Sequence, residues 1–185
     1  MANSLSLYGG TYDYDDDNTS NLVGINYHLE NNDFNLIESI KLNPVIGLFV
    51  TGKSASMLYS GFETNIGQDK VSLNLSSAAG IYDNGSGKDL GNDLQFKSEI
   101  NIFFELDKSS KIGFGSHHIS NAGLSSRNPG TNADNIQQRA RFCGYKSEDH
   151  LNLSRLWLDN GNLNFYKAAL VTENSIRHGL KNHLP

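Results

Sequence analysis

Apolar and polar residues alternate along most of the first 120 positions of the chain. Such alternation is typical of β-strands, in which successive side chains point to opposite faces. Seven alternating segments are separated by stretches rich in Gly, Asn, Asp and Ser. They begin near Leu5, Val23, Ile40, Leu58, Val71, Leu94 and Ile112. An eighth segment, expected over residues 136–142, would close the sheet, although its alternation is poor.

Short and long connections follow one another between these segments, which predicts an all-β, eight-stranded antiparallel up-and-down barrel. Alternation alone does not say which face is outside. Charged residues on the less apolar faces favour a transmembrane barrel with a polar interior over a soluble, lipocalin-like carrier. These residues are Lys41, Glu63, Lys97, Glu99 and Glu105. The outward side chains are then expected to include Ile100, Ile102, Phe104, Ile112 and Phe114.

Two parts of the chain depart from this regular pattern. Pro44 removes a ladder donor from the third segment, so a local irregularity is expected there. Residues 1–142 are expected to form the barrel and residues 143–185 a C-terminal extension. Within that extension, Asn160-Gly161 lies between Leu-rich runs and is typical of a tight hairpin turn. A further hairpin and a segment foreign to the barrel both remain open.

The composition narrows the function. With 15 basic and 20 acidic residues among 185, the net charge of −5 argues against nucleic acid as a partner. Cys143 is the single cysteine, so no intrachain disulfide is expected. The sequence shows no apolar run long enough for a membrane-spanning helix and no signal-peptide pattern. The acidic stretch over residues 13–20 is read as a solvated loop, with a cation site as the alternative.

Candidate chemistry is concentrated at the end of the seventh segment. His118 and Ser120 lie two residues apart and share a strand face, and a Ser–His pair is the core of an activated nucleophile. The plainer interpretation is two polar residues at a membrane–water boundary. His117 has the opposite parity and is expected to point into the lumen. No histidine or cysteine spacing indicates a metal site, and no cofactor motif is present.

The sequence around this pair resembles a known family. His118-Ile-Ser-Asn-Ala-Gly123, followed by Asn128-Pro-Gly130, is similar to the motif of the lipid A 3-O-deacylases, the PagL-type outer-membrane acyl hydrolases. The segment Gly87-Lys-Asp-Leu-Gly91, with Leu94, Phe96 and Ser98, resembles the stretch that precedes this motif in the family. The resemblance covers about residues 5–132 and implies an eight-stranded outer-membrane barrel with its active site on the outer wall.

The resemblance also implies an activity, a location and roles for named residues. The protein would be a serine esterase of the bacterial outer membrane that removes the 3-O-linked acyl chain from lipid A of lipopolysaccharide. Ser120 would be the nucleophile and His118 the general base, with Asn121, Gly123 and Asn128 in the oxyanion-stabilising region. Lipopolysaccharide and outer-membrane lipids would be the partners, and a homodimer is compatible with this reading. No cofactor is implied.

One position departs from the family pattern. Where the family has a glutamate that orients the histidine, this sequence has Asn132. An asparagine can accept the imidazole N–H but lacks the charge of a triad acid. Asp134 lies two residues on and is the alternative orienting residue. A non-catalytic outer-membrane barrel, structural or lipid-binding, is therefore kept as the second functional hypothesis.

Overall fold

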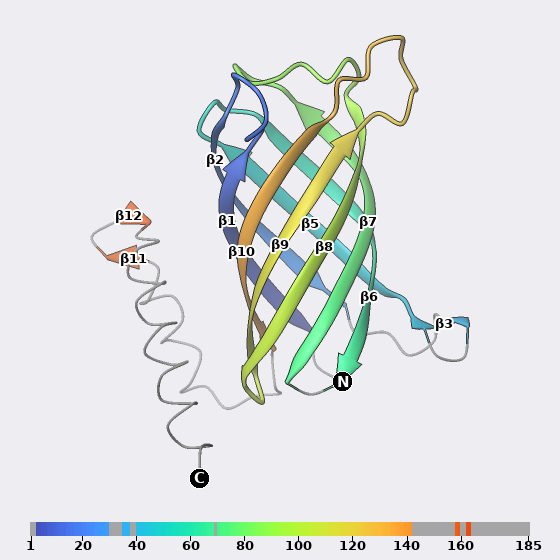
Figure 1. The fold of residues 1–185 in the computed structure, drawn as a ribbon, viewed down its shortest axis with the longest axis vertical. Coiled ribbons are helices and arrows are strands. Elements are labelled where there is room, and N and C mark those ends of the chain that lie inside the picture. Colours follow the sequence, from blue (N-terminus) through green and yellow to red (C-terminus); the bar gives the residue numbers. More distant parts are fainter. Residues whose placement is uncertain are drawn as a thin grey trace. The chain divides into compact units, whose positions relative to one another are not determined.

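The computed structural model describes residues 3–29, 35–37, 40–68, 70–141, 158–159 and 162–163. Eight strands form a closed antiparallel barrel in which each pairs with the next along the chain, and the last pairs with the first (Figure 1). They are β1 (Ser4–Tyr12), β2 (Ser20–His28), β5 (Asn43–Thr51), β6 (Ser56–Gln68), β7 (Val71–Asp83), β8 (Leu94–Asp107), β9 (Ser110–Ser120) and β10 (Thr131–Arg141). The predicted up-and-down barrel is confirmed. Among the described residues, no helix is long and apolar enough to cross a bilayer.

Two elements differ from the expected segments. The third segment is divided into two strands, β4 (Ile40–Lys41) and β5. The short strand β4 pairs with β3 (Asn35–Ile37), and Pro44 is the second residue of β5. Proline is tolerated near a strand end because few ladder bonds are lost there. The eighth strand begins at Thr131 rather than near residue 136. Its inward positions are mainly polar or small, so apolar alternation does not mark its start.

The residues beyond the barrel belong to a second compact unit, Cys143–Pro185. Within it, β11 (Leu158–Asp159) pairs antiparallel with β12 (Asn162–Leu163), on either side of Asn160-Gly161. This ladder forms its own two-stranded sheet and is not a member of the barrel sheet. The role of residues 143–185 as a separable extension stays a prediction.

The barrel interior is polar and charged. Glu63 accepts hydrogen bonds from both terminal nitrogens of Arg139, at 3.0 and 2.9 Å, and from Asn74 at 3.0 Å. Lys97 forms an ion pair with Glu99, which also accepts a 2.6 Å bond from Gln137. Buried charges are costly unless they are paired and hydrogen-bonded, and these networks provide partners for the charged side chains of the lumen.

This interior decides between the two barrel types. A lipocalin-like carrier needs an apolar interior lining, whereas this lumen is lined by polar and charged side chains. The soluble carrier is therefore excluded. Lys41 and Glu105 were also expected on the inner face, but Lys41 is exposed and Glu105 half-buried. Lys41 lies in β4, outside the barrel sheet, and Glu105 precedes a register shift at the end of β8.

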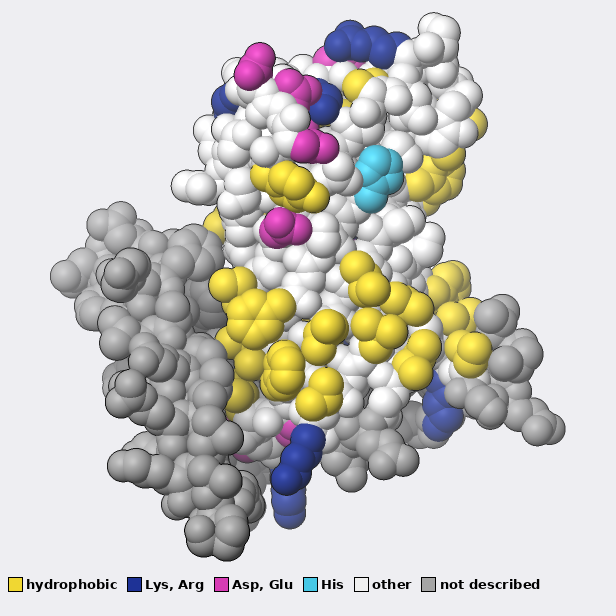
Figure 2. Space-filling model, viewed as in Figure 1, with side chains coloured by type: hydrophobic (Ala, Val, Ile, Leu, Met, Phe, Trp, Pro, Cys, Tyr) yellow, Lys and Arg dark blue, Asp and Glu magenta, His cyan; other side chains and the backbone are white. Residues whose placement is uncertain are grey.

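The outer wall is apolar over β5–β10. Ile100, Ile102, Phe104 and Phe114 are exposed by 43–50%, as expected for an outward face. Ile112 keeps the same parity, opposite Phe104, but its own side chain is buried. Figure 2 shows the hydrophobic side chains as a band across the visible face, with charged side chains toward both ends. A charged lumen inside an apolar wall is the arrangement of barrels that span lipid membranes.

The two ends of the barrel differ in their connections. One end carries residues 13–19, 52–55, 84–93 and 121–130, while the other carries the short connections 69–70 and 108–109. The connection from β2 to β5, which contains β3 and β4, also lies at the second end and is longer. Long loops therefore gather at the end that is uppermost in Figure 1.

Candidate active site

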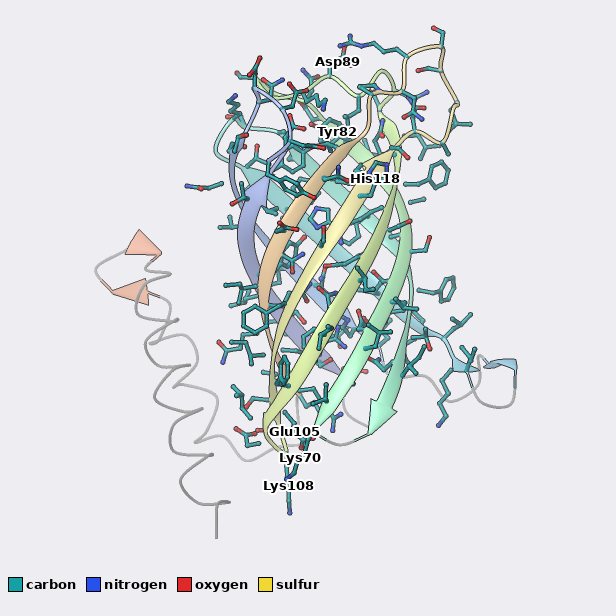
Figure 3. All side chains as sticks on the ribbon, in the orientation of Figure 1. Lys70, Tyr82, Asp89, Glu105, Lys108 and His118 are labelled. Carbon is teal, nitrogen blue, oxygen red and sulfur yellow. The ribbon has the colours of Figure 1, made fainter. Side chains whose placement is uncertain are left out.

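His118 and Ser120 lie at the C-terminal end of β9, which is at the end of the barrel that carries the long loops. His118 is exposed and Ser120 half-buried on the outer face, whereas His117 and Ile119 point inward and are buried. The expected lumenal position of His117 is confirmed. Figure 3 labels His118 near the upper end of the barrel. The period of two in the strand is what places the histidine and the serine on one face.

Asn132 is the residue that the fold brings to His118. The two residues are direct register partners across β9 and β10, and Asn132 Oδ1 lies 2.8 Å from His118 Nδ1. With Nδ1–H donating to this oxygen, Nε2 carries the lone pair that a general base needs. Asp134 lies opposite Ser116, and no hydrogen bond joins Asp134 to His118 in the described part of the chain.

Ser120 is the last residue of β9, opposite Phe96 of β8. Within the described ranges, no hydrogen bond links its hydroxyl to His118. Hydrogen bonds of catalytic pairs are often long before substrate binds and tighten in the reacting complex. His118 and Ser120 could therefore serve as a base and a nucleophile on one strand, with Phe96 as the register partner of Ser120.

The loop after Ser120 is organised by the buried side chain of Asn121. Its Nδ2 donates to the carbonyl oxygens of Leu90 at 2.9 Å and Arg127 at 2.8 Å, and its Oδ1 accepts the Gly123 N–H at 3.0 Å. Its own N–H donates to Asn128 Oδ1 at 3.0 Å. The backbone N–H groups of Asn121 and Gly123 are thus already used within the loop. Of the three expected oxyanion residues, Asn128 retains an amide Nδ2 that can donate.

Gly130 closes this loop against the imidazole. Its φ of +62° lies in the left-handed region, and a Cβ added there would sit 2.9 Å from Cε1 and 3.3 Å from Nε2 of His118. Only glycine combines that backbone conformation with such a close approach at little cost. The Asn128-Pro-Gly130 motif is visible in the sequence, but nothing in its pattern indicates that Gly130 contacts His118.

A second group missed by pattern reasoning comes from the β1–β2 loop. Asp15 Oδ2 accepts a 2.8 Å hydrogen bond from Asn132 Nδ2, so Asn132 bridges Asp15 and His118. The acidic run was the available signal, but its spacing gives no indication that it meets β10. Among the described residues, no group of three or more His, Cys, Asp or Glu could hold a metal ion.

The β1–β2 loop is fixed in place by Asp13. Its fully buried carboxylate accepts hydrogen bonds from Thr131 Oγ1 at 2.8 Å and from Lys88 Nζ at 3.0 Å. The backbone N–H of Asp13 donates to the Asn132 carbonyl oxygen at 2.7 Å. Lys88 also lies 2.9 Å from Asp16. The hydrogen bond from Lys88 holds the pKa of the Asp16 carboxyl below its usual value. Burial alone would lower the pKa of Lys88, but the Asp16 and Asp13 carboxylates raise it.

Comparisons with known proteins agree with this fold. The family model described as lipid A 3-O-deacylase (PagL) matches residues 7–139. The crystal structure of the outer membrane enzyme PagL is similar, with a TM-score of 0.59 and 16% identity over 74% of this chain and 98% of that one. Neisserial surface protein A has a TM-score of 0.47 and 8% identity over 76% of this chain and 97% of its own. None of the curated proteins matches the sequence.

Proposed function

Because the chain belongs to the lipid A 3-O-deacylase (PagL) family, we propose that it is a serine esterase of the bacterial outer membrane. Its reaction is removal of the 3-O-linked acyl chain from lipid A of lipopolysaccharide. The observation that carries this proposal is the 2.8 Å bond between His118 and Asn132, on the outer face of the strand that also carries Ser120. This bond orients His118 as a base on the strand face that carries the nucleophile Ser120, although the glutamate of the family pattern is absent.

The reaction would proceed by acyl transfer to Ser120. His118 Nε2 takes the hydroxyl proton as Oγ attacks the ester carbonyl, and the resulting oxyanion is held by Asn128 Nδ2. One such donor is typically worth about 3 kcal/mol in the transition state. Collapse breaks the ester bond, and His118 returns the proton to the departing sugar oxygen. Water, deprotonated by His118, then hydrolyses the acyl-enzyme and releases the fatty acid.

The position of the pair on the barrel wall suits a lipid substrate. Ser120 faces outward beside Phe96, which is 37% exposed, and Leu124 of the adjoining loop is 55% exposed. The apolar band of β5–β10 continues below them. If the long loops face the exterior, as is the rule in such barrels, the pair lies at the level of the outer leaflet. Acyl chains could then lie along the wall while their ester bonds reach Ser120.

The test is mass spectrometry of lipid A after incubation with purified protein in detergent. The wild type is expected to remove the mass of one acyl chain, and Ser120→Ala to leave the lipid unchanged, because no acyl-enzyme can form without the serine oxygen. Heat-modifiable migration on gels would verify that each protein is folded. A folded wild type that leaves lipid A intact would favour the non-catalytic barrel. Fatty acid release that persists in Ser120→Ala would place the chemistry elsewhere.

A further inference from the structure

We propose that Asp15 is a positioning residue that acts through Asn132 to supply the negative charge missing from the Ser-His pair. This inference builds on the proposed function, because it concerns the same base. It begins from the chain of two 2.8 Å hydrogen bonds, His118 Nδ1 to Asn132 Oδ1 and Asn132 Nδ2 to Asp15 Oδ2. An amide at position 132 therefore stands between the imidazole and a carboxylate.

The carboxylate determines which way the amide points. The oxygen and nitrogen of an asparagine side chain are nearly indistinguishable by shape, so hydrogen-bond partners must assign them. An ionised carboxylate only accepts hydrogen bonds, and it therefore selects Nδ2 of Asn132 as its neighbour. Oδ1 is then left facing His118, where it can only accept, and the histidine must carry its proton on Nδ1. Asp15 thus fixes the tautomer with Nε2 as the base.

The loop that carries Asp15 is held firmly enough for this role. Asp13, two residues earlier, is fully buried and bonded to Thr131 and Lys88, and its N–H donates to the carbonyl of Asn132 itself. Lys88 also pairs with Asp16, on the other side of Asp15. Asp13 is therefore bonded to β10 and to the β7–β8 loop, and Asp16 is bonded to the β7–β8 loop. The Asp15 carboxylate remains beside Asn132 as a consequence.

The charge has a second effect during catalysis. When His118 accepts the Ser120 proton it becomes an imidazolium, which a nearby anion stabilises. Here the anion acts across a polarised amide rather than by direct contact, and Asp15 is solvent-exposed. Loss of a directly bonded triad acid costs about 10⁴-fold in kcat. Loss of the relayed charge should cost less, about tenfold, and should change kcat rather than KM because Asp15 has no contact with the site of attack.

The first experiment measures the tautomer and needs no turnover. Imidazole ¹⁵N shifts of the labelled barrel in detergent would report the protonated nitrogen, with the His118→Gln variant identifying the His118 signals among the six histidines. The wild type is expected to show the Nδ1–H form. Asp15→Asn should give a mixture of tautomers, while Asp17→Asn, which removes the same charge from the same loop, should match the wild type. Identical tautomers in all three proteins would overturn the inference.

The second experiment uses the reaction and a second background. Asp15→Asn should lower kcat about tenfold relative to Asp17→Asn. In an Asn132→Glu background the same substitution should cause no loss, because the carboxylate then contacts His118 directly and a second carboxylate beside it is repulsive. A merely structural role would lower kcat in both backgrounds and would contradict the proposal. If the folded wild type hydrolyses no lipid A but the tautomer shift is seen, the proposed substrate is wrong and the role of Asp15 stands.

Discussion

Gly130 lies against the edge of the His118 ring: a Cβ at this glycine would stand 2.9 Å from Cε1 of the histidine. The same loop contains Gly123, which has a similar left-handed φ of +79° but has nothing within 4 Å of the corresponding Cβ position. The two glycines share the backbone conformation and differ in their contact with His118. They form a matched pair for separating loop strain from displacement of His118.

We predict that Gly130→Ala lowers kcat by about 10- to 100-fold, because misplacement of a catalytic group by about 1 Å can cost that much. Gly123→Ala should keep activity within about threefold, since it meets only the left-handed strain of about 1–2 kcal/mol. Acyl release from lipid A is the measurement, with thermal unfolding of both variants compared. Equal losses in the two variants would mean that loop strain, and not the contact with His118, controls the rate.

The two candidate orienting residues should respond differently to substitution. Asn132→Ala removes the partner of His118 Nδ1 and should reduce kcat by about 10²-fold or more, in the range of general-base contributions. Asp134→Ala should leave kcat within about twofold, because Asp134 lies opposite Ser116 and is not bonded to His118. Steady-state kinetics on the two variants is the measurement. A large loss in Asp134→Ala alone would transfer the orienting role to that residue.

Lys88 should be needed for activity although it lies outside the reacting pair. Lys88→Met leaves the buried Asp13 carboxylate without its cation, at a cost of about 3 kcal/mol, and loosens the β1–β2 loop. We expect kcat to fall about tenfold. Lys53→Met is the control, because Lys53 makes only longer contacts of 3.2 and 3.4 Å with the same loop. Equal activity of the two variants would show that the loop does not need this anchor.

The pH dependence of this anchor follows from the two pKa shifts. The lowered pKa of Asp16 means that its contribution is present above the unfolded value of about 3.9 and is lost as pH falls below it. The raised pKa of Lys88 means that its contribution is present below about 10.4 and is lost as pH rises through the folded value. The ratio of wild-type to Lys88→Met activity should therefore stay constant between about pH 5 and 9. A steep change inside that window would contradict the anchor.

Removing one partner of the lumenal ion pair should destabilise the barrel, because the other charge is then left buried without compensation. Glu63→Ala leaves Arg139 buried without its carboxylate and should lower the free energy of unfolding by about 3–5 kcal/mol. Glu105→Ala, at a half-buried position near a strand end, should change it by less than about 0.5 kcal/mol. Urea unfolding in lipid vesicles is the measurement. Equal midpoints would show that water or other groups replace the carboxylate.

Residues 143–185 should be dispensable for the barrel. All eight strands of the closed sheet lie within Ser4–Arg141, so a protein ending at residue 142 should fold and keep a heat-modifiable gel shift. Its acyl release should match that of the full chain, because the residues proposed for catalysis precede position 135. Loss of the gel shift on truncation would show that the extension supports the barrel.

Several local features followed from the sequence because they depend on neighbours along the chain. Strand alternation predicted the barrel, because side chains in a pleated strand repeat every two residues. It also predicted that Ile100 and Phe104 point outward and that His117 points into the lumen. The same rule placed His118 and Ser120 on one face. The predicted start of β10 was five residues too late, because the inward side chains of this strand are mainly polar or small and carry no apolar signal.

Tertiary structure alone decided which distant residues meet. Asp15 and Asn132 are 117 positions apart, and Asp13 and Thr131 are 118 apart, yet each pair is hydrogen-bonded. These contacts exist because β1 closes the barrel against β10 in one register, which aligns the β1–β2 loop with the start of β10. The alternation of a strand fixes its faces but not its partner or register. The sequence therefore determined the strand faces and the common face of His118 and Ser120, and barrel closure determined which residues lie beside the histidine.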